Sequence, residues 1–303
     1  MNLSTYDHLL QLIPKEDILL DEPLSRHTTF RVGGNADALL QIQNPEQLAG
    51  VLSIFHKTNE NYFILGNGSN VLVGDRGYHG TVLQISEKWN QIVVEGDRMR
   101  IQAGALLSAV ARCAMEHALT GLEFASGIPG TIGGGIVMNA GAYGGEMKQV
   151  ISCVTVMDQT GKMMTLDHDT LEFGYRTSVI KRNAYIVLEA ELQLTQGNRE
   201  KIKSTMEELA AKRREKQPLE YPSAGSTFKR PEGYFAGKLI MDTGLRGFRI
   251  GGAQVSEKHC GFVINTGNAT AEDVIEVIQE VQERVRNKFG VTLETEVICL
   301  GEF

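Results

Sequence analysis

The feature that most constrains this chain is a glycine-rich stretch between Gly121 and Gly145, with the sequence GLEFASGIPGTIGGGIVMNAGAYGG. Glycine at this density costs backbone entropy on folding, so it indicates positive φ angles or a close approach of the main chain to a ligand. Apolar residues such as Ile128, Ile132 and Ile136 are interleaved with the glycines, unlike in a solvated linker. Backbone N–H groups gathered by such a loop form a concavity that commonly binds phosphate. We therefore expect the stretch to lie against a buried ligand, with a tight surface loop or a bulged strand as the alternative.

A second turn of small residues, Gly66-Asn67-Gly68-Ser69-Asn70, lies between apolar strands predicted at 62–65 and 71–73. The turn does not match a dinucleotide-binding GxGxxG motif, because Val71 stands where the third glycine belongs, and it lacks the GK[ST] of a phosphate-binding P-loop. Its backbone and its amide and hydroxyl side chains can still hold a phosphate or a carbonyl group. We interpret it as a second ligand-binding turn.

Composition limits the classes of protein to which the chain can belong. Its 303 residues predict two or three domains, and 30 basic against 37 acidic residues give a net charge of −7. That balance offers no electrostatic case for nucleic acid or for an anionic membrane. The first residues do not resemble a signal peptide, no apolar run reaches membrane-spanning length, and the four cysteines form no close pair. We therefore expect a cytoplasmic protein with reduced thiols, no metal site and no membrane insertion.

Periodicity and capping signals predict helices at 3–20, from Asn44-Pro45 through Phe55, at 105–118, at 199–216, and from a capping box at Thr270–Asp273 to Gly290. They predict a strand that reaches Gly33-Gly34, a second strand that ends at Ile42, a meander over 81–104, a hairpin at 150–157 and 162–166, and strands at 184–194, 263–265 and 291–300. Strands with few helices before residue 190 are an α+β pattern rather than a doubly wound one. We place a domain boundary near Gln196-Gly197-Asn198.

Six motifs occur in one order along nearly the whole chain, and two of them contain the glycine-rich segments described above: HTTFRVGG (27–34), LGNGSNVLV (65–73), GLEFASGIPGTIGGGIVMNAGAYGGEM (121–147), FGYRTSV (173–179), AGSTFKRP (224–231) and LETEV (293–297). Together they resemble the bacterial UDP-N-acetylenolpyruvoylglucosamine reductases, flavoenzymes of peptidoglycan precursor synthesis. The resemblance implies an α+β fold with two FAD-binding subdomains of the vanillyl-alcohol-oxidase type, at 1–80 and 81–196. A C-terminal α+β substrate-binding domain follows at 197–303. The short interval between the FGYRTSV and AGSTFKRP motifs resembles the shorter type II subset, which lacks an insertion carrying a substrate-covering tyrosine.

The resemblance also implies a reaction. NADPH reduces non-covalently bound FAD, and flavin N5 then delivers hydride to the enolpyruvyl ether of UDP-N-acetylglucosamine enolpyruvate, giving the lactyl ether of UDP-N-acetylmuramate. Arg176 matches the catalytic arginine and Glu296 the catalytic glutamate, which would stabilise the enolate, while Ser226 matches the serine that donates the proton. Without the resemblance, these residues would be interpreted as a salt-bridged arginine, a solvated acid and a turn serine. Alternation places Glu294 on the same face as Glu296, so only the motif selects between them.

Further positions acquire binding roles from the same resemblance. The predicted cofactor-binding residues are Gly66, Asn67, Gly68, Ser69, Asn70, Gly127, Ile128, Pro129, Gly130, Thr131, Gly133, Gly134, Asn139 and Gly141. The predicted substrate-binding residues are Tyr175, Arg213, Lys216 and Lys229. Lys216 is equally well interpreted as a cation placed favourably at a helix C-terminus.

Four more residues receive no firm role from the sequence. Arg230 stands where the family often has asparagine, while Arg246 and Arg249 add positive charge for phosphate or NADPH. His259 is predicted to be structural.

Two other hypotheses stay open beside the reductase. An oxidase of the same superfamily would often hold its flavin through histidine or cysteine, and residues 66–70 and 121–145 contain neither. A catalytically silent nucleotide-binding protein would have no reason to keep Arg176, Ser226 and Glu296 together in their motifs. We expect a monomer whose partners are small molecules, not nucleic acid.

Overall fold

The computed structural model describes residues 3–85 and 87–303. Its backbone divides into two compact units, each considered by itself. Unit 1 contains the described residues up to Leu20, 38–67 and 80–213, and unit 2 contains 21–37, 68–79 and 214–303. The chain therefore passes repeatedly from one unit to the other. The division into domains predicted from the sequence stays a prediction.

The structure contains short and long helices in both units. The helices are α1 (Leu3–Leu9), α2 (Pro45–Thr58), α3 (Leu107–Glu116), α4 (Ile132–Val137), α5 (Val179–Arg182), α6 (Arg199–Lys216), α7 (Ala236–Asp242) and α8 (Ala271–Phe289), with 3₁₀ turns η1 (Lys15–Asp17), η2 (Leu24–Arg26), η3 (Glu123–Gly127) and η4 (Met147–Gln149).

The strands are β1 (Ile18–Pro23), β2 (Asn35–Gln41), β3 (Tyr62–Leu65), β4 (Val71–Val73), β5 (Tyr78–Gln84), β6 (Ile92–Glu95), β7 (Arg98–Gln102), β8 (Leu119–Thr120), β9 (Gly141–Ala142), β10 (Gly145–Glu146), β11 (Ile151–Met157), β12 (Met163–Asp167), β13 (Ile186–Gln193), β14 (Thr195–Gln196), β15 (Arg249–Ile250), β16 (Ala253–Val255), β17 (Val263–Asn265) and β18 (Ile298–Leu300).

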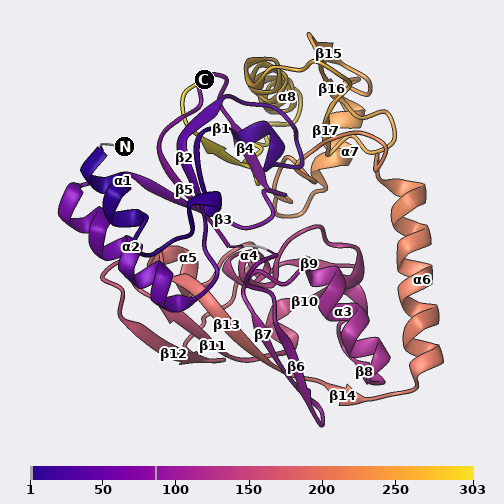
Figure 1. Ribbon diagram of the computed structural model, residues 1–303. Coiled ribbons are helices and arrows are strands. Elements are labelled where there is room, and N and C mark those ends of the chain that lie inside the picture. Colours follow the sequence, from indigo (N-terminus) through magenta and orange to yellow (C-terminus); the bar gives the residue numbers. More distant parts are fainter. Residues whose placement is uncertain (1–2, 86) are drawn as a thin grey trace. The chain divides into compact units, whose positions relative to one another are not determined.

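The largest sheet of unit 1 is antiparallel, with five strands in the order β12-β11-β13-β7-β6 (Figure 1). Val154 and Val156 of β11 are fully buried, whereas Thr155 between them is not, as the alternation of a strand with one covered face requires. The short helix α4 packs against β13 and β7. One apolar core joins this sheet to α2, α3 and α4.

A buried polar network fixes the N-terminal part of unit 1. Asp17 is 1% exposed, forms an ion pair with Lys88 and accepts a hydrogen bond from the Gln43 side chain. Burial of a carboxylate without such partners would cost free energy, so Asp17 needs both the ion pair and the hydrogen bond in order to be buried.

Unit 2 is organised by α8, whose buried face is formed by Ala271, Val274, Val277, Ile278, Val281 and Val285. The predicted capping box is confirmed, because Thr270 and Asp273 each accept a hydrogen bond from the other's backbone N–H. The Asp75 carboxylate adds hydrogen bonds from the N–H groups of Ala271, at 2.8 Å, and Glu272, at 3.0 Å. These donors have no partner within a helix, so Asp75 completes the N-terminus.

Four predictions of secondary structure are wrong in part. The helix expected at 3–20 ends at Leu9, since Pro14 cannot continue it, and β1 begins at Ile18. Residues 27–34 form no strand, because Arg31 and Gly33 adopt φ angles of 57° and 104°.

The other two errors concern pairing. The meander expected over 81–104 is divided, with β5 in one sheet and the β6–β7 hairpin in another. Of the closing strand at 291–300, only β18 is regular, and it pairs in parallel with β4.

Candidate active site

The two glycine-rich segments meet within unit 1. A Cβ added to Gly66 would stand 2.6 Å from Thr131 Oγ1, and Asn67 Nδ2 donates a hydrogen bond to the Pro129 carbonyl at 2.5 Å. Both segments were predicted to bind the cofactor. The fold thus brings their main chains together, with only small side chains between them.

The three consecutive glycines of α4 differ in what surrounds them. A Cβ on Gly133 would lie 3.0 Å from the Ala103 carbonyl oxygen, and one on Gly135 would lie 3.0 Å from a Leu107 methyl group. Gly134 is exposed, and within 4 Å a Cβ there would meet, among the described residues beyond its own helix backbone, only Thr131 Oγ1, at 3.6 Å. Packing therefore explains glycine at the two buried positions but not at Gly134, where close approach of a ligand would explain it.

The rest of the first loop belongs to unit 2. Gly68 has a φ of 59°, and a Cβ on it would lie 2.0 Å from the His27 carbonyl oxygen and 2.8 Å from Thr28 Cα. The Thr28 hydroxyl is buried and has no hydrogen-bond partner among the residues that the structure describes. A buried hydroxyl of this kind is available to an ordered water or to a polar group of a ligand. Thr28 lies in the HTTFRVGG motif, but its residue type and spacing gave no sign of a binding role.

Arg176 lies in a tight turn of unit 1. The backbones of Gly174 and Thr177 pair across the turn, and Arg176 itself has a φ of 56°. Its guanidinium carbon stands 5.2 Å from the centre of the exposed Tyr175 ring, which is within cation–π range. A left-handed conformation is costly for a side chain of this size, so the surrounding structure must impose it.

Asn139 contributes to that constraint by contacting the first residue of the turn. Its side chain is 1% exposed and donates to the Gly174 carbonyl at 3.1 Å and to Glu146 Oε2 at 2.8 Å, while Oδ1 accepts from Lys148 N–H at 2.9 Å. Both amide protons are thus used within the protein. Asn139 connects the glycine-rich stretch to the turn that carries Arg176, a role that the sequence did not reveal.

Ser226 and Glu296 lie on two paired segments of unit 2. The Glu296 N–H donates to the Thr227 carbonyl, and the Lys229 N–H donates to the Glu294 carbonyl, each at 2.8 Å. Asn70 Nδ2 also donates to the Glu296 carbonyl at 3.0 Å. The backbone thus brings two of the three predicted catalytic residues onto adjacent segments, while Arg176 belongs to the other unit.

The side chains beside these segments already have partners. Lys229 Nζ lies 2.8 Å from Glu294 Oε2, and this contact lowers the pKa of the Glu294 carboxyl, first through the hydrogen bond and then through charge. The Arg230 guanidinium stacks on the exposed ring of Phe235, 3.9 Å from its centre. Lys216 is exposed at the end of α6.

The other basic residues noted in the sequence, Arg246, Arg249 and His259, belong to unit 2. Arg249 Nε donates to the Gly251 carbonyl, and Arg246 contacts the Met241 sulfur. Burial lowers the pKa of His259, whose Nδ1 accepts a hydrogen bond from the Gly261 N–H.

The thiols and possible metal ligands show no sign of a reactive centre. Burial raises the pKa of all four free cysteines, Cys113, Cys153, Cys260 and Cys299. No cluster of possible metal ligands occurs among the described residues, and none of the helices in that part of the chain is long and apolar enough to cross a membrane.

Comparison with known proteins first defines a class. Residues 36–167 match the model of an FAD-binding domain. The structure of Phl p 4.0202, a glucose dehydrogenase, has a TM-score of 0.51 to 65% of this chain at 12% identity, which is a likeness of fold alone. The protein is therefore an FAD-binding flavoprotein with the predicted vanillyl-alcohol-oxidase type of fold.

More similar proteins then define the family. Residues 217–300 match the C-terminal domain of UDP-N-acetylenolpyruvoylglucosamine reductase. The reductase of that name from Thermus caldophilus has a TM-score of 0.80 and 35% identity, with coverage of 93% of this chain and 98% of the relative. The Clostridioides difficile reductase is 52% identical over 99% of both chains, and the Caldanaerobacter subterraneus reductase is 50% identical over 98% of both. The chain belongs to the UDP-N-acetylenolpyruvoylglucosamine reductase family.

This membership confirms the predicted family and the α+β flavoprotein fold. It also confirms the oxidoreductase class, with FAD as cofactor and NADPH as reductant. The roles assigned to individual residues stay predictions.

Proposed function

We propose that the protein binds FAD non-covalently and uses NADPH to reduce the enolpyruvyl ether of UDP-N-acetylglucosamine enolpyruvate. The product would be the lactyl ether, UDP-N-acetylmuramate, a peptidoglycan precursor. The observation that carries the proposal is the 52% identity, over 99% of the chain, to a reductase named for this substrate.

The residues of the two glycine-rich segments fit FAD. Gly66 lies close to Thr131, so the two segments adjoin through small residues, and no contact among the described residues requires glycine at position 134. Thr28 supplies a buried hydroxyl that needs a polar partner. These features support cofactor binding by residues 66–70 and by the predicted positions between Gly127 and Gly141, with Asn139 holding the surrounding backbone rather than the ligand.

FAD, when bound, supplies the hydride that reaches the vinyl carbon of the substrate. Negative charge then develops on the neighbouring carbon and its carboxylate, so a fixed cation is needed there. The Arg176 guanidinium can hold a carboxylate through two hydrogen bonds and does not lose its proton. The turn constrained by Asn139 supports this role, because it holds the arginine backbone in one conformation.

Protonation of the second carbon completes the reduction. We assign this proton to the Ser226 hydroxyl, which needs help from a neighbouring charge because an isolated hydroxyl is a weak acid. Glu296 is placed on the adjacent segment, where its carboxyl group can orient that hydroxyl. Glu294 forms an ion pair with Lys229, and the LETEV motif is the basis for choosing Glu296.

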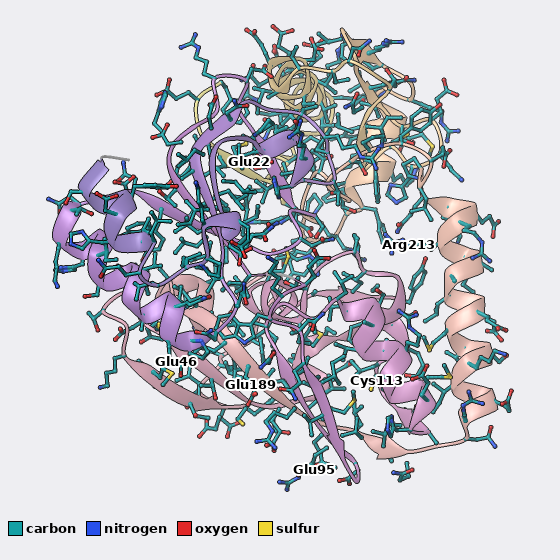
Figure 2. The ribbon with its side chains drawn as sticks, viewed as in Figure 1. Glu22, Glu46, Glu95, Cys113, Glu189 and Arg213 are labelled. Atoms are coloured by element: carbon teal, nitrogen blue, oxygen red, sulfur yellow. The ribbon has the colours of Figure 1, made fainter. Side chains whose placement is uncertain are left out.

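Substrate recognition is proposed for Tyr175, Lys216 and Lys229. The diphosphate would compete with Glu294 for the Lys229 ammonium group, since that carboxylate already lies within hydrogen-bond distance. We propose the same role for Arg213, which the family resemblance assigns to substrate binding and which lies near the C-terminal end of α6 (Figure 2).

The organisation of the protein is part of the proposal. We assign FAD-binding subdomains to 1–80 and 81–196 and a substrate-binding domain to 197–303, which is compatible with family matches at 36–167 and 217–300. We also propose a monomer in the cytoplasm, where nucleotide-linked precursors and NADPH are available.

An anaerobic titration of the purified protein tests the function. NADPH should bleach the yellow flavin, and subsequent addition of UDP-N-acetylglucosamine enolpyruvate should restore it, with formation of the lactyl ether. Bleaching without recovery would exclude the substrate, and a protein that cannot be loaded with FAD would exclude the flavoenzyme. In a separate aerobic run, reoxidation of the reduced flavin faster by oxygen than by the enolpyruvyl substrate would favour the oxidase hypothesis.

A further inference from the structure

Ser178 is the serine of the FGYRTSV motif, and its side chain is completely buried. It occupies the N-cap position of α5, where a serine hydroxyl ordinarily accepts a hydrogen bond from a backbone N–H of the first helical turn. No such bond is present in this described part of the chain. The hydroxyl instead donates to the Val137 carbonyl at 2.7 Å, across a sequence separation of 41. The serine therefore serves a distant contact rather than its own helix.

The acceptor of this hydrogen bond lies at a helix C-terminus. Val137 is the last residue of α4, so its carbonyl oxygen has no donor within the helix. Ser178 supplies a donor for it, and the bond also satisfies a hydroxyl that is itself buried. The two helices pack against each other (Figure 1). The bond thus joins the end of α4 to the beginning of α5.

Both ends of the turn that carries Arg176 are attached to this end of α4. Asn139, two residues after Val137, donates to the Gly174 carbonyl at 3.1 Å, and Ser178 donates to Val137 itself. Gly174 lies two residues before Arg176, and Ser178 lies two residues after it. Arg176 is therefore held midway between two attachments to one helix end.

The backbone of Arg176 needs such attachment on both sides. Its φ of 56° lies in the left-handed region, which is unfavourable for a residue with a Cβ. Lys181 Nζ also lies 3.5 Å from the Arg176 carbonyl oxygen, but this contact is exposed and long for a hydrogen bond. The buried bond from Ser178 is the better constraint on the C-terminal side of the turn.

We propose that Ser178 is a positioning residue for the reduction, which holds the Arg176 backbone so that the guanidinium meets the carboxylate of the enolpyruvyl group. This inference rests on the proposed function, in which Arg176 stabilises the enolate. Ser178 acts without touching the substrate, since its hydroxyl is buried and is used by Val137. A guanidinium binds a carboxylate through two hydrogen bonds only within a narrow range of orientations, so a shift of its backbone slows the reaction.

An effect of Ser178 through the flavin has to be separated from an effect through Arg176. The reason is that α4 also contains Gly133 and Gly134, which are predicted to bind FAD. A displaced α4 would alter the surroundings of the flavin and hence its midpoint potential. A displaced Arg176 turn would leave that potential unchanged.

The test compares Ser178→Ala with Ile180→Val, a matched control that trims a fully buried side chain of α5 and leaves the hydroxyl in place. Stopped-flow absorbance measures reoxidation of the reduced enzyme by saturating UDP-N-acetylglucosamine enolpyruvate in a single turnover. Ser178→Ala should slow this step by roughly 10- to 100-fold, with the midpoint potential of the flavin unchanged. Ile180→Val should change neither quantity.

A double-mutant cycle shows whether Ser178 acts through Arg176. In the Arg176→Ala background there is no guanidinium to position, so adding Ser178→Ala should slow reoxidation no further. A serine with only a structural role would lower the rate by the same factor in both backgrounds, or would lower only the thermal stability. Either result would overturn the inference, and so would a changed midpoint potential in Ser178→Ala.

Two further variants keep the inference testable if Ser178→Ala does not fold. Ser178→Cys has nearly the shape of serine but a weak donor, whereas Ser178→Thr keeps the hydroxyl donor, so reoxidation should be slower in the cysteine variant. Equal rates in these two variants would contradict a role for the hydrogen bond. Reoxidation of Arg176→Ala at the wild-type rate would instead reject the role of Arg176 in the proposed function.

Discussion

Lys229 Nζ lies 2.8 Å from Glu294 Oε2, so one of the two glutamates near the end of the chain already has a cationic partner. Glu296, two residues further on, is half-buried, and its backbone is fixed by hydrogen bonds to Thr227 and Asn70. Alternation along the segment could not distinguish the two carboxylates. The ion pair places Glu294 at the surface beside Lys229, and the assignment of the catalytic role to Glu296 stays a prediction from its motif.

Substitution of each glutamate tests this distinction. Glu296→Gln should slow reoxidation of the reduced flavin by the enolpyruvyl substrate by about 10²- to 10⁴-fold, the range for loss of an acid–base group. Glu294→Gln should slow it by less than about tenfold, because an exposed ion pair contributes little. Stopped-flow absorbance measures this step, with flavin reduction by NADPH as the control. A larger defect in Glu294→Gln would reverse the assignment.

Gly134 tests the cofactor cradle. Gly134→Ala should leave the free energy of unfolding of the apoprotein unchanged or raise it by up to about 1 kcal/mol. Alanine is the better helix former, and the site has space for its methyl group. The same change should weaken FAD binding about tenfold or more, since the methyl group would occupy the approach of the ligand.

Gly133→Ala is the matched control for that variant. Its Cβ would lie 3.0 Å from the Ala103 carbonyl oxygen, so it should destabilise the apoprotein by about 1–3 kcal/mol. Thermal unfolding and FAD titration measure both quantities. Unchanged FAD affinity in Gly134→Ala would remove Gly134 from the binding site.

Asn139 is expected to affect catalysis indirectly, by holding the turn that carries Arg176. Asn139→Ala loses three side-chain hydrogen bonds and places alanine at a φ of 45°, so the free energy of unfolding should fall by about 2–4 kcal/mol. Asn139→Gly loses the same hydrogen bonds without the backbone strain, so its free energy of unfolding should fall by a smaller amount. Both variants should show a lower kcat with flavin still bound. A normal kcat in both would show that the turn is held by other contacts.

His259 predicts a pH dependence of stability. Burial keeps its pKa below the ordinary value of 6.5, and Nδ1 accepts a hydrogen bond that protonation there would break. The unfolded chain therefore binds a proton more readily than the native protein does. The stability associated with this group is fully present above about pH 6.5 and is lost as pH falls toward the lower pKa of the native state.

Urea unfolding of the wild-type protein and His259→Gln measures this effect. The advantage in unfolding free energy of the wild type over the variant should be largest near neutral pH and should shrink at about pH 5.5. A constant difference between the two proteins would mean that His259 has the same pKa in both states.

Asp75 is predicted to stabilise unit 2 through the N-terminus of α8. Asp75→Ala removes the acceptor for two backbone N–H groups and should lower the free energy of unfolding by about 1–2 kcal/mol. Asp75→Asn keeps an acceptor but loses the charge, so its effect should be smaller. Equal losses in both variants would show that the charge, not the hydrogen bonding, dominates.

Local signals in the sequence were sufficient to predict the long helices α6 and α8. The bounds of α6 agree with the predicted 199–216, and the capping box of α8 was identified residue by residue. The glycine-rich stretch is different, because IGGGIV has little helical propensity and yet forms α4. Packing of Gly133 and Gly135 against other segments overrides that propensity, and no local pattern shows it.

Prediction of the candidate site depended more heavily on the family resemblance than prediction of the helices did. Arg176, Ser226 and Glu296 would each have been interpreted as ordinary surface residues without their motifs. The contacts that define their surroundings join distant positions, with a sequence separation of 35 for Asn139 and Gly174 and of 65 for Lys229 and Glu294. Such pairings arise only when the chain has folded, so periodicity and spacing could not predict them.

The composition of the unit 2 core has a consequence for synthesis on the ribosome. Phe30, Val32 and Leu72 are buried in that core, but the residues that cover them lie between Ala224 and Val297. At a typical 5–20 residues per second, Leu72 waits roughly 10 to 50 seconds before its packing partners have all been translated. These three apolar side chains are thus available to chaperones on every nascent chain, and a chain truncated before α8 never acquires the cover for them.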